Sequence, residues 1–280
     1  MIPILHKPGR YLGMHPSDLA NKPYAQYWNP KPAALSQQAT AALTRGPVAP
    51  SLLPSLEKSA EIFKRPGEYL ENGFCLTVNG AMHVTTVIDF PDATPMMFDW
   101  WFGWHSDEPQ RYKLWHPEAH VHAEWLKKPP LGATGRDAYI GRVSIVDEYL
   151  GSTLGRYAIQ FQPPEKFGLD AAELKSKNQA TAICARIGFG DFPIDAGYLI
   201  HYVRRTASGS RMYCRFWLGG PYVAARRGGS IGRVAARLAA LVARPSEADA
   251  RALFVHCNEE MPHLATFLPQ IFAEFNNDNA

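Results

Sequence analysis

The spacing of apolar and polar residues changes along the chain, and it predicts helices at both ends with strands between them. Residues 1–70 are rich in proline and small residues, with candidate helices at Leu35–Arg45 and Ser55–Lys64. We interpret this stretch as an N-terminal helical arm. Residues 71–280 are then expected to form one larger domain.

The middle of the chain reads as a series of strands. Phe74–Val78 and Met82–Phe90 flank Asn79-Gly80, a pair that favours a hairpin turn. Further strands are predicted at Ala138–Leu150, Leu154–Gln162, Thr181–Gly188, Gly197–Thr206 and Arg211–Leu218. The last two flank the turn signal ASGS, so we expect a second hairpin there.

Helix signals appear at two later points. Thr94-Pro95 precedes a short segment that holds three of the seven tryptophans. Ser246 and Asp249 form a candidate capping box for a helix over about Glu247–Phe275, with kinks at prolines 262 and 269. Antiparallel strands before one long terminal helix predict an α+β fold, a curved sheet gripping the helix around an apolar cavity lined by aromatic side chains.

The composition and the net charge of the chain narrow the class of molecule that it is expected to bind. With 46% hydrophobic residues in 280, the chain can bury a sizeable core. The 29 basic and 26 acidic residues leave a net charge of +3 and are interspersed, so neither nucleic acid nor an anionic membrane is an obvious partner. No segment has the roughly 20 apolar residues of a membrane span, and the N-terminus lacks the apolar region of a signal peptide. We therefore expect a cytoplasmic protein with a small neutral or weakly acidic ligand.

Two other residue sets favour structural roles. The cysteines are far apart and are interpreted as free, mostly buried thiols: Cys75, Cys184, Cys214 and Cys257. A run of arginines alternates with alanine and leucine at helical spacing: Arg226, Arg227, Arg233, Arg237 and Arg244. That spacing favours the solvated face of an amphipathic helix over a nucleic-acid patch.

The stretch HCNEEMPH, residues 256–263, places two histidines and two glutamates on one predicted helix. Residues four apart lie above one another on a helix, so His256 and Glu260 can reach a common point. An imidazole nitrogen and a carboxylate oxygen suit zinc. Glu259 is a weaker alternative ligand, and an exposed turn that happens to be polar is the alternative for the whole stretch.

A second cluster, LWHPEAHVHAEW, contains His116, His120, His122 and Glu124. Pro117 restricts the backbone beside His116. His116 and His120 would share a face on a helix, whereas His120 and His122 would share one on a strand. The sequence leaves open which of the three binds metal, and packing is the simpler interpretation of His120 and His122.

Two predicted strands carry further candidates. Strand alternation points Asp147 and Glu148 to opposite faces, but it does not say which acid faces inward. His201 lies in mid-strand among apolar neighbours, where it is either a satisfied core histidine or a general acid/base. The chain has no GxxxxGK[ST], GxSxG or HExxH motif, so the common nucleotide, serine-hydrolase and zincin interpretations lack support.

Taken together, four segments resemble the 2,4-diacetylphloroglucinol hydrolase family, which includes phloretin hydrolases: residues 98–120, 146–151, 197–203 and 256–260. The resemblance runs from about residue 72 to 265. It implies a helix-grip (Bet v 1-like) domain with an added N-terminal helical segment, and it makes a homodimer an expectation. It also implies a catalytic Zn2+ held by His116, Glu148, His256 and Glu260.

The implied activity is hydrolysis of the carbon–carbon bond between an acyl group and a polyhydroxylated aromatic ring. The substrate would be an acylphloroglucinol or a phloretin-like ketone. His201 would donate a proton beside the metal, and Tyr198 and Tyr213 would bind phenolic oxygens. The alternatives are a helix-grip protein that binds a hydrophobic ligand without chemistry, or a metal-free polyketide cyclase or aromatase.

Overall fold

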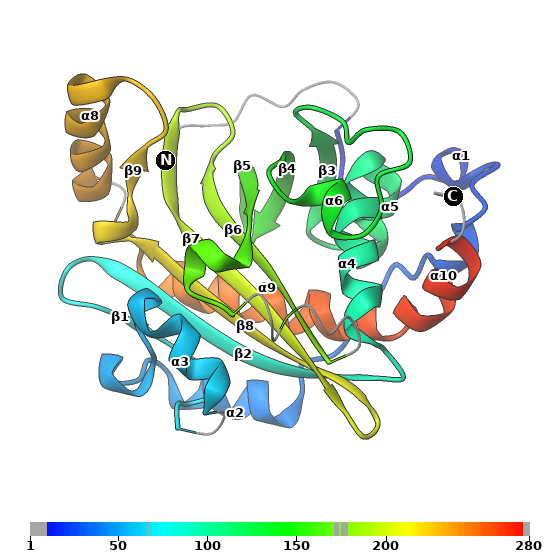
Figure 1. The fold of residues 1–280 in the computed structure, drawn as a ribbon, viewed down its shortest axis with the longest axis horizontal. Helices are drawn as coiled ribbons and strands as arrows, with labels where there is room; N and C mark the ends of the chain where they lie inside the picture. Colours follow the sequence, from blue (N-terminus) through cyan, green and yellow to red (C-terminus); the bar gives the residue numbers. More distant parts are fainter. Residues whose placement is uncertain (1–9, 66–67, 171–173, 175–178, 243, 277–280) are drawn as a thin grey trace.

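A long helix near the C-terminus, α9 (Glu247–Ala265), lies across a curved antiparallel sheet (Figure 1). The computed structural model describes residues 10–65, 68–170, 174, 179–242 and 244–276. Within these residues the strands, numbered in chain order, lie side by side in the order 1-2-8-7-6-5-4-3, and the ninth strand pairs with the seventh. This arrangement confirms the α+β, helix-grip fold.

Both predicted hairpins are present. The strands are β1 (Gly73–Leu76), β2 (Ala81–Pro91), β3 (His120–Trp125), β4 (Val143–Leu150), β5 (Thr153–Gln162), β6 (Ala180–Phe189), β7 (Ile194–Thr206), β8 (Gly209–Gly219) and β9 (Ala224–Ala225). Gly80 turns between β1 and β2 with a φ of 82°, a value that glycine adopts without strain. The strand predicted from Ala138 instead begins at Val143, because α6 (Arg136–Tyr139) and a left-handed Gly141 precede it.

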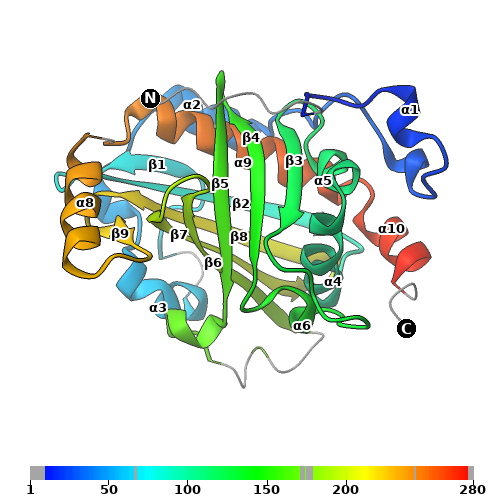
Figure 2. The same ribbon diagram turned by 90° about the horizontal axis from the view of Figure 1, so that it is seen from above.

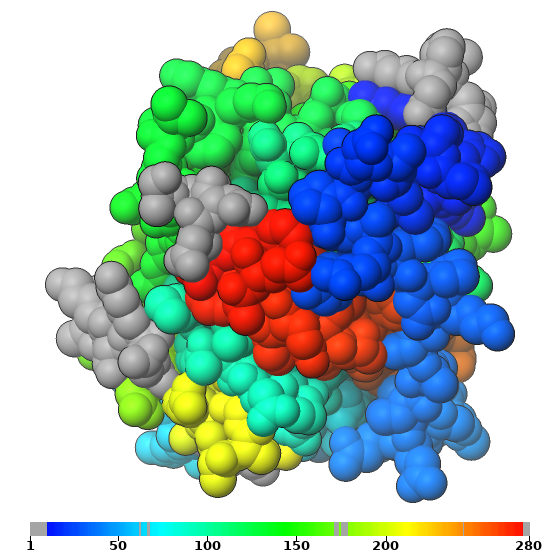
Figure 3. All heavy atoms as spheres, turned by 90° about the vertical axis from the view of Figure 1, so that its right-hand side faces the viewer, coloured from blue at the N-terminus to red at the C-terminus, as the bar shows by residue number. Residues whose placement is uncertain are grey.

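The N-terminal residues pack onto the domain. Their helices are α1 (Pro16–Leu19), η1 (Ala25–Tyr27), α2 (Gln37–Arg45), η2 (Pro50–Leu52), η3 (Leu56–Lys58) and α3 (Ser59–Lys64). Tyr24 and Ala42 belong to the main hydrophobic core. The Tyr27 hydroxyl donates a hydrogen bond to Glu274 near the C-terminus, and Figure 3 shows the N-terminal segment against the C-terminal helix. The division at residue 70 remains a prediction.

Two helices inserted between β2 and β3 bring aromatic side chains to the inner face of the sheet. They are α4 (Pro95–Trp104) and α5 (Pro109–Trp115), joined by η4 (His105–Asp107). Figure 2 shows both helices beside β3. Trp101 and Phe102 each contact the ring of Trp115 edge to face. The aromatic residues expected to line a cavity therefore pack against one another here.

The single helix predicted over about Glu247–Phe275 is two helices in the structure, α9 and α10 (Leu268–Phe275), separated at Thr266 and Phe267, and their outer ends match the prediction. The remaining helices are η5 (Pro164–Phe167), η6 (Gly220–Tyr222) and α8 (Gly229–Val242). The backbone nitrogen of Ser246 donates to Asp249, and the backbone nitrogen of Asp249 donates to the Ser246 hydroxyl, so the capping box of α9 is confirmed. Pro262 lies within α9, while Pro269 is in the first turn of α10. None of the described helices is long and apolar enough to cross a membrane.

Candidate metal centre

Three side chains converge where two strands of the sheet meet α9. His120 begins β3, Glu148 lies on β4 and His256 lies on α9. Each offers one ligand atom, and these atoms all lie within 4.8 Å of one another. Imidazole nitrogens and a carboxylate oxygen are donors that zinc accepts. The group fits a metal ion in its donor chemistry and in its convergence.

His120 reaches this point because of an irregularity in its strand. His120 pairs with Glu148 and His122 pairs with Asp147, so two steps on β3 match one step on β4. Such a bulge breaks the strict alternation of side chains. His122 therefore does not share the face of His120, and its Nε2 atom lies 3.7 Å from Glu124.

The ring of His120 is fixed in an orientation that suits a ligand. Its Nδ1 atom lies 2.9 Å from the carbonyl oxygen of Tyr112, so it donates there and leaves Nε2 as the acceptor. Tyr112 also stacks on the ring, with centroids 3.7 Å apart. The Nε2 atom is buried and has no hydrogen-bond partner among the described residues. Burial holds the pKa of His120 well below its ordinary value, with the nearby His256 as the next cause, so the imidazole is neutral.

Glu260 lies next to both histidines. Its Oε2 atom is 3.5 Å from Nε2 of His120 and 3.5 Å from Nε2 of His256. His256 and Glu260 thus lie within reach of each other, as their spacing of one helical turn predicts, and that both bind a metal ion remains a prediction. Burial raises the pKa of Glu260 to about 7, against the opposing charges of His201 and His116. A buried carboxylate beside neutral imidazoles is stabilised by a proton or by a cation.

The two adjacent acids on β4 have separate roles. Glu148 faces the histidines, and the Tyr112 hydroxyl donates to it. Asp147 faces the other way and forms ion pairs with Arg10 and Arg156. Burial raises the pKa of Glu148, although His256 and Tyr112 oppose the increase. Of the two acids, Glu148 is the one placed to bind a metal ion.

His116 differs from the expectation. It follows α5, and its Nε2 atom lies 3.4 Å from Glu259 rather than from Glu260. Its ring centroid is 4.8 Å from that of His256, so it lies beside the group without belonging to it. The structure brings His120, rather than the His116 implied by the family resemblance, together with Glu148 and His256. The reason is local: the chain turns after Pro117, and the amide of His120 donates to the carbonyl of His116.

His201 lies on β7 and faces the same side of the sheet as the metal group. Its cross-strand partner is Cys214 on β8, which is also its hydrogen-bond partner. Burial alone would lower the pKa of His201, but Cys214 and then Glu260 raise it above the ordinary value. The pKa of the Cys214 thiol is correspondingly lowered to about 6, despite burial, by hydrogen bonds with Cys257 and His201. His201 and Cys214 therefore form a buried hydrogen-bonded pair in which each side chain favours the charged form of the other.

Tyr198 and Tyr213 are not at this site. A second hydrophobic cluster, which includes Cys184 and Trp217, contains Tyr213, and Tyr198 packs against it. Leu199 and Val203, which flank His201 at two-residue spacing, belong instead to the main core. Side chains one or three positions apart on a strand point to opposite faces. Tyr198 and Tyr213 therefore lie on the face of the sheet opposite to His201, and the expectation that they bind the substrate beside His201 is corrected.

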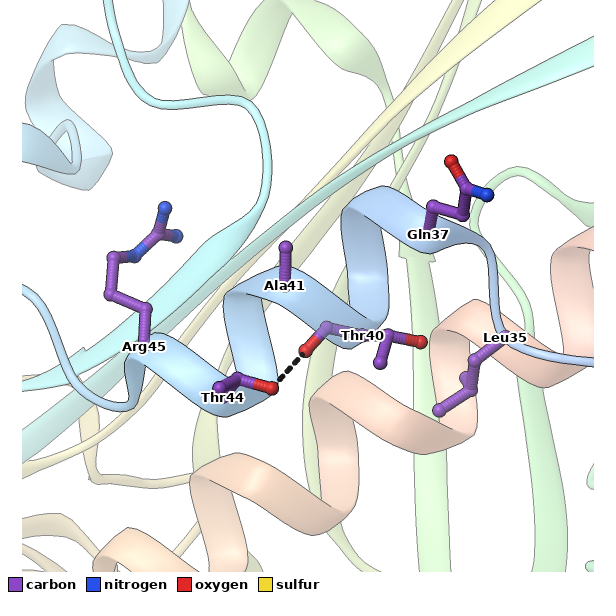
Figure 4. A pocket seen from close by; sticks show the side chains of 6 residues that line it. All are labelled: Leu35, Gln37, Thr40, Ala41, Thr44 and Arg45. Carbon is purple, nitrogen blue, oxygen red and sulfur yellow. Dashed lines mark hydrogen bonds between the residues drawn. The ribbon is translucent and has the colours of Figure 1, made fainter.

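A surface groove along α2 is not a candidate for the same chemistry. Leu35, Gln37, Thr40, Ala41, Thr44 and Arg45 line it, and its volume is about 580 Å3 (Figure 4). The Thr44 hydroxyl donates to the Thr40 carbonyl one turn earlier on α2. No histidine or carboxylate is among these lining residues.

Sequence reasoning missed the roles of Tyr112 and Cys214 and left that of His120 open. Tyr112 lies within residues 98–120, one of the segments that carry the family resemblance, but its contact with Glu148 joins α5 to β4 across the fold. Cys214 could have been found from the second hairpin, whose register places it opposite His201.

Comparisons with known proteins identify the family of the chain. The family model described as the DAPG hydrolase PhiG domain matches residues 52–273. A 2,4-diacetylphloroglucinol hydrolase of Pseudomonas protegens is 30% identical over 274 residues, covering 93% of this chain and 87% of that protein. A phloretin hydrolase of Eubacterium ramulus is 27% identical over 258 residues, covering 90% and 89%. Among solved structures, Ara h 8.0201 covers 63% of this chain and 99% of its own at 10% identity, with a TM-score of 0.32.

Proposed function

Because the chain belongs to the DAPG hydrolase family, we propose that it is a zinc-dependent hydrolase acting on a carbon–carbon bond in a ketone. The substrate is an acylated polyphenol such as 2,4-diacetylphloroglucinol or a phloretin-like ketone. The products are the deacylated phenol and a carboxylic acid. The convergence of His120, Glu148 and His256 carries this proposal.

His120, Glu148 and His256 would hold the zinc ion, and Glu260 would supply a fourth donor. Zinc would act there as a Lewis acid toward the ketone oxygen and would lower the pKa of water. The protein contributes the orientation of the donors. Tyr112 fixes His120 through its carbonyl and Glu148 through its hydroxyl, so both ligands are held by one residue.

The reaction is a retro-Claisen-type cleavage. A proton is added to the ring carbon that bears the acyl group and a neighbouring phenolic hydroxyl loses its proton, so the phenol is converted to its keto tautomer. Water then adds to the acyl carbonyl, and the bond between that carbon and the ring breaks. The electron pair returns to the ring oxygen as an enolate, which becomes the phenol on protonation, and the acyl group leaves as the carboxylic acid.

His201 would be the proton donor to the ring carbon. Its hydrogen bond with Cys214 and the nearby Glu260 favour the imidazolium form. The ring also lies between Phe102 and Phe216, with centroids 6.0 and 5.6 Å away, so its position is fixed by packing. A charged acid held in an apolar site is suited to protonate carbon.

The test combines metal analysis with product analysis. Purified protein should contain one zinc per chain and should release acetic acid from 2,4-diacetylphloroglucinol or a phenylpropionic acid from phloretin. If protein with full zinc occupancy produced no acid from either ketone, the proposed hydrolase activity would be contradicted. A cytoplasmic location and a homodimer remain predictions.

A further inference from the structure

Helix α8 presents its apolar side away from the protein. Its large aliphatic residues are exposed: Ile231 by 83%, Val234 by 56%, Leu238 by 58%, Leu241 by 64% and Val242 by 87%. Ala236 is the buried residue of this helix. At 100° per residue, the five aliphatic side chains occupy one arc directly opposite Ala236. A helix that turns its apolar arc outward needs another surface to cover it.

The same segment is strongly basic. Residues 220–246 contain five arginines and no aspartate or glutamate. Arg226 is paired with Asp195, its Nε atom 2.7 Å from Oδ1, and this pair fixes the start of the segment to β7. Arg227, Arg233, Arg237 and Arg244 are exposed, and no carboxylate of the described residues pairs with them. The exposed apolar arc is thus accompanied by uncompensated positive charge.

The arginines gather in a groove beside the apolar arc. Four of them line the groove between α8 and β9, whose volume is about 460 Å3: Arg226, Arg227, Arg233 and Arg237. Arg233 and Arg237 are one turn apart, on the flank between buried Ala236 and the outward arc. A ligand on this face would meet positive charge at the groove and aliphatic carbon next to it.

We propose that α8 and its arginines form a docking face for the surface of an anionic phospholipid membrane. Amphipathic helices with an aliphatic arc and basic flanks lie in the headgroup region, with the arc in the acyl boundary and the arginines on the phosphates. A second copy of the chain would cover the arc but would bring like charges together. Nucleic acid would neutralise the arginines but would leave the aliphatic side chains in water.

The position of the helix is compatible with this role. In Figures 1 and 2, α8 stands at one end of the molecule and α4, α5 and α10 lie at the other end. The metal group lies next to α5 and β3, so a membrane on α8 does not cover it. The charge totals of the sequence did not suggest a membrane partner, because they average this segment with the rest of the chain.

Vesicle sedimentation with the full-length protein tests the proposal. The protein should sediment with vesicles of phosphatidylcholine that contain about one third phosphatidylglycerol, and added salt should reduce the bound fraction. Arg233→Gln/Arg237→Gln should weaken partitioning about 30-fold, from roughly fivefold for each arginine. Leu238→Ser/Leu241→Ser should abolish it. Arg204→Gln/Arg205→Gln, which removes two exposed arginines from β7, is the matched control and should bind as wild type.

Thermal unfolding checks that the variants are folded, and light scattering of the eluted protein gives the oligomeric state. Wild-type protein that does not sediment with the anionic vesicles would overturn the proposal. Equal binding by the α8 variants and the control would also overturn it. A dimer that the leucine variant converts to monomer, without vesicle binding, would instead assign the face to a second copy.

Discussion

The Nε2 atom of His120 lies 3.5 Å from the Oε2 atom of Glu260, although one residue begins β3 and the other lies on α9. His256 is at the same distance from that oxygen. The sheet and the helix it grips therefore meet at one carboxylate. The metal group depends on this contact between sheet and helix, because neither element carries all of its side chains.

The first prediction concerns the choice of histidine. His120→Ala should lose stoichiometric zinc and all measurable hydrolysis, because it removes a buried nitrogen that has no hydrogen-bond partner in the part of the chain that the structure describes. His122→Ala should retain zinc, since His122 contacts Glu124 instead. Elemental analysis of the two purified variants decides this. Full zinc content in His120→Ala together with loss in His116→Ala would restore the assignment of His116.

The second prediction separates the neighbouring acids. Glu148→Gln should lose zinc, whereas Asp147→Asn should keep it and lose about 1–3 kcal/mol of stability, because Arg10 and Arg156 lose a buried partner. Zinc content and denaturant unfolding measure the two effects. The opposite pattern, with zinc lost only in Asp147→Asn, would falsify the assignment of Glu148.

The third prediction concerns Tyr112. Tyr112→Phe keeps the ring stacked on His120 but removes the hydroxyl that donates to Glu148. We expect zinc affinity or turnover to fall about 10- to 100-fold. Tyr139→Phe, which removes a similar hydroxyl contact with Asp99, is the control for the loss of a buried hydrogen bond. Equal zinc affinities in the two variants and wild type, measured by competition with a chelator, would count against the role of Tyr112.

The fourth prediction is a pH dependence of the metal-free protein. The folded pKa of Glu260 is about 7 and its ordinary value is 4.5, so the folded chain binds more protons than the unfolded chain between these values. Stability should therefore fall as pH rises through this window, by up to about 3 kcal/mol. Denaturant unfolding of metal-free wild type and Glu260→Gln at several pH values tests this. Identical pH dependence in both proteins would exclude Glu260 as the cause.

The fifth prediction concerns the His201–Cys214 pair. Cys214→Ala removes the group that raises the pKa of His201, so the fall of kcat at alkaline pH should move to lower pH. Cys184 belongs to the second hydrophobic cluster on the other face of the sheet, so Cys184→Ala should lower stability without moving the pH at which kcat falls. The kcat–pH profile distinguishes the variants, and a profile unchanged in Cys214→Ala would assign the cysteine to packing alone.

Local rules were sufficient for much of the fold. The Asn79-Gly80 hairpin, the cap at Ser246 and the pairing of His256 with Glu260 depend on residues within a few positions of one another. The two strands around ASGS also follow from local spacing. Period and turn chemistry are properties of the chain itself, so the sequence could predict these features.

Tertiary structure decided which faces meet. The bulge between His120 and His122 selects His120, and strand parity turns Tyr198 and Tyr213 away from His201. The sequence predicted an amphipathic helix near Arg233, but only its packing through Ala236 shows that the aliphatic side faces outward. A periodic pattern defines two faces of an element without saying which one the rest of the chain covers, because that depends on contacts between residues distant in sequence.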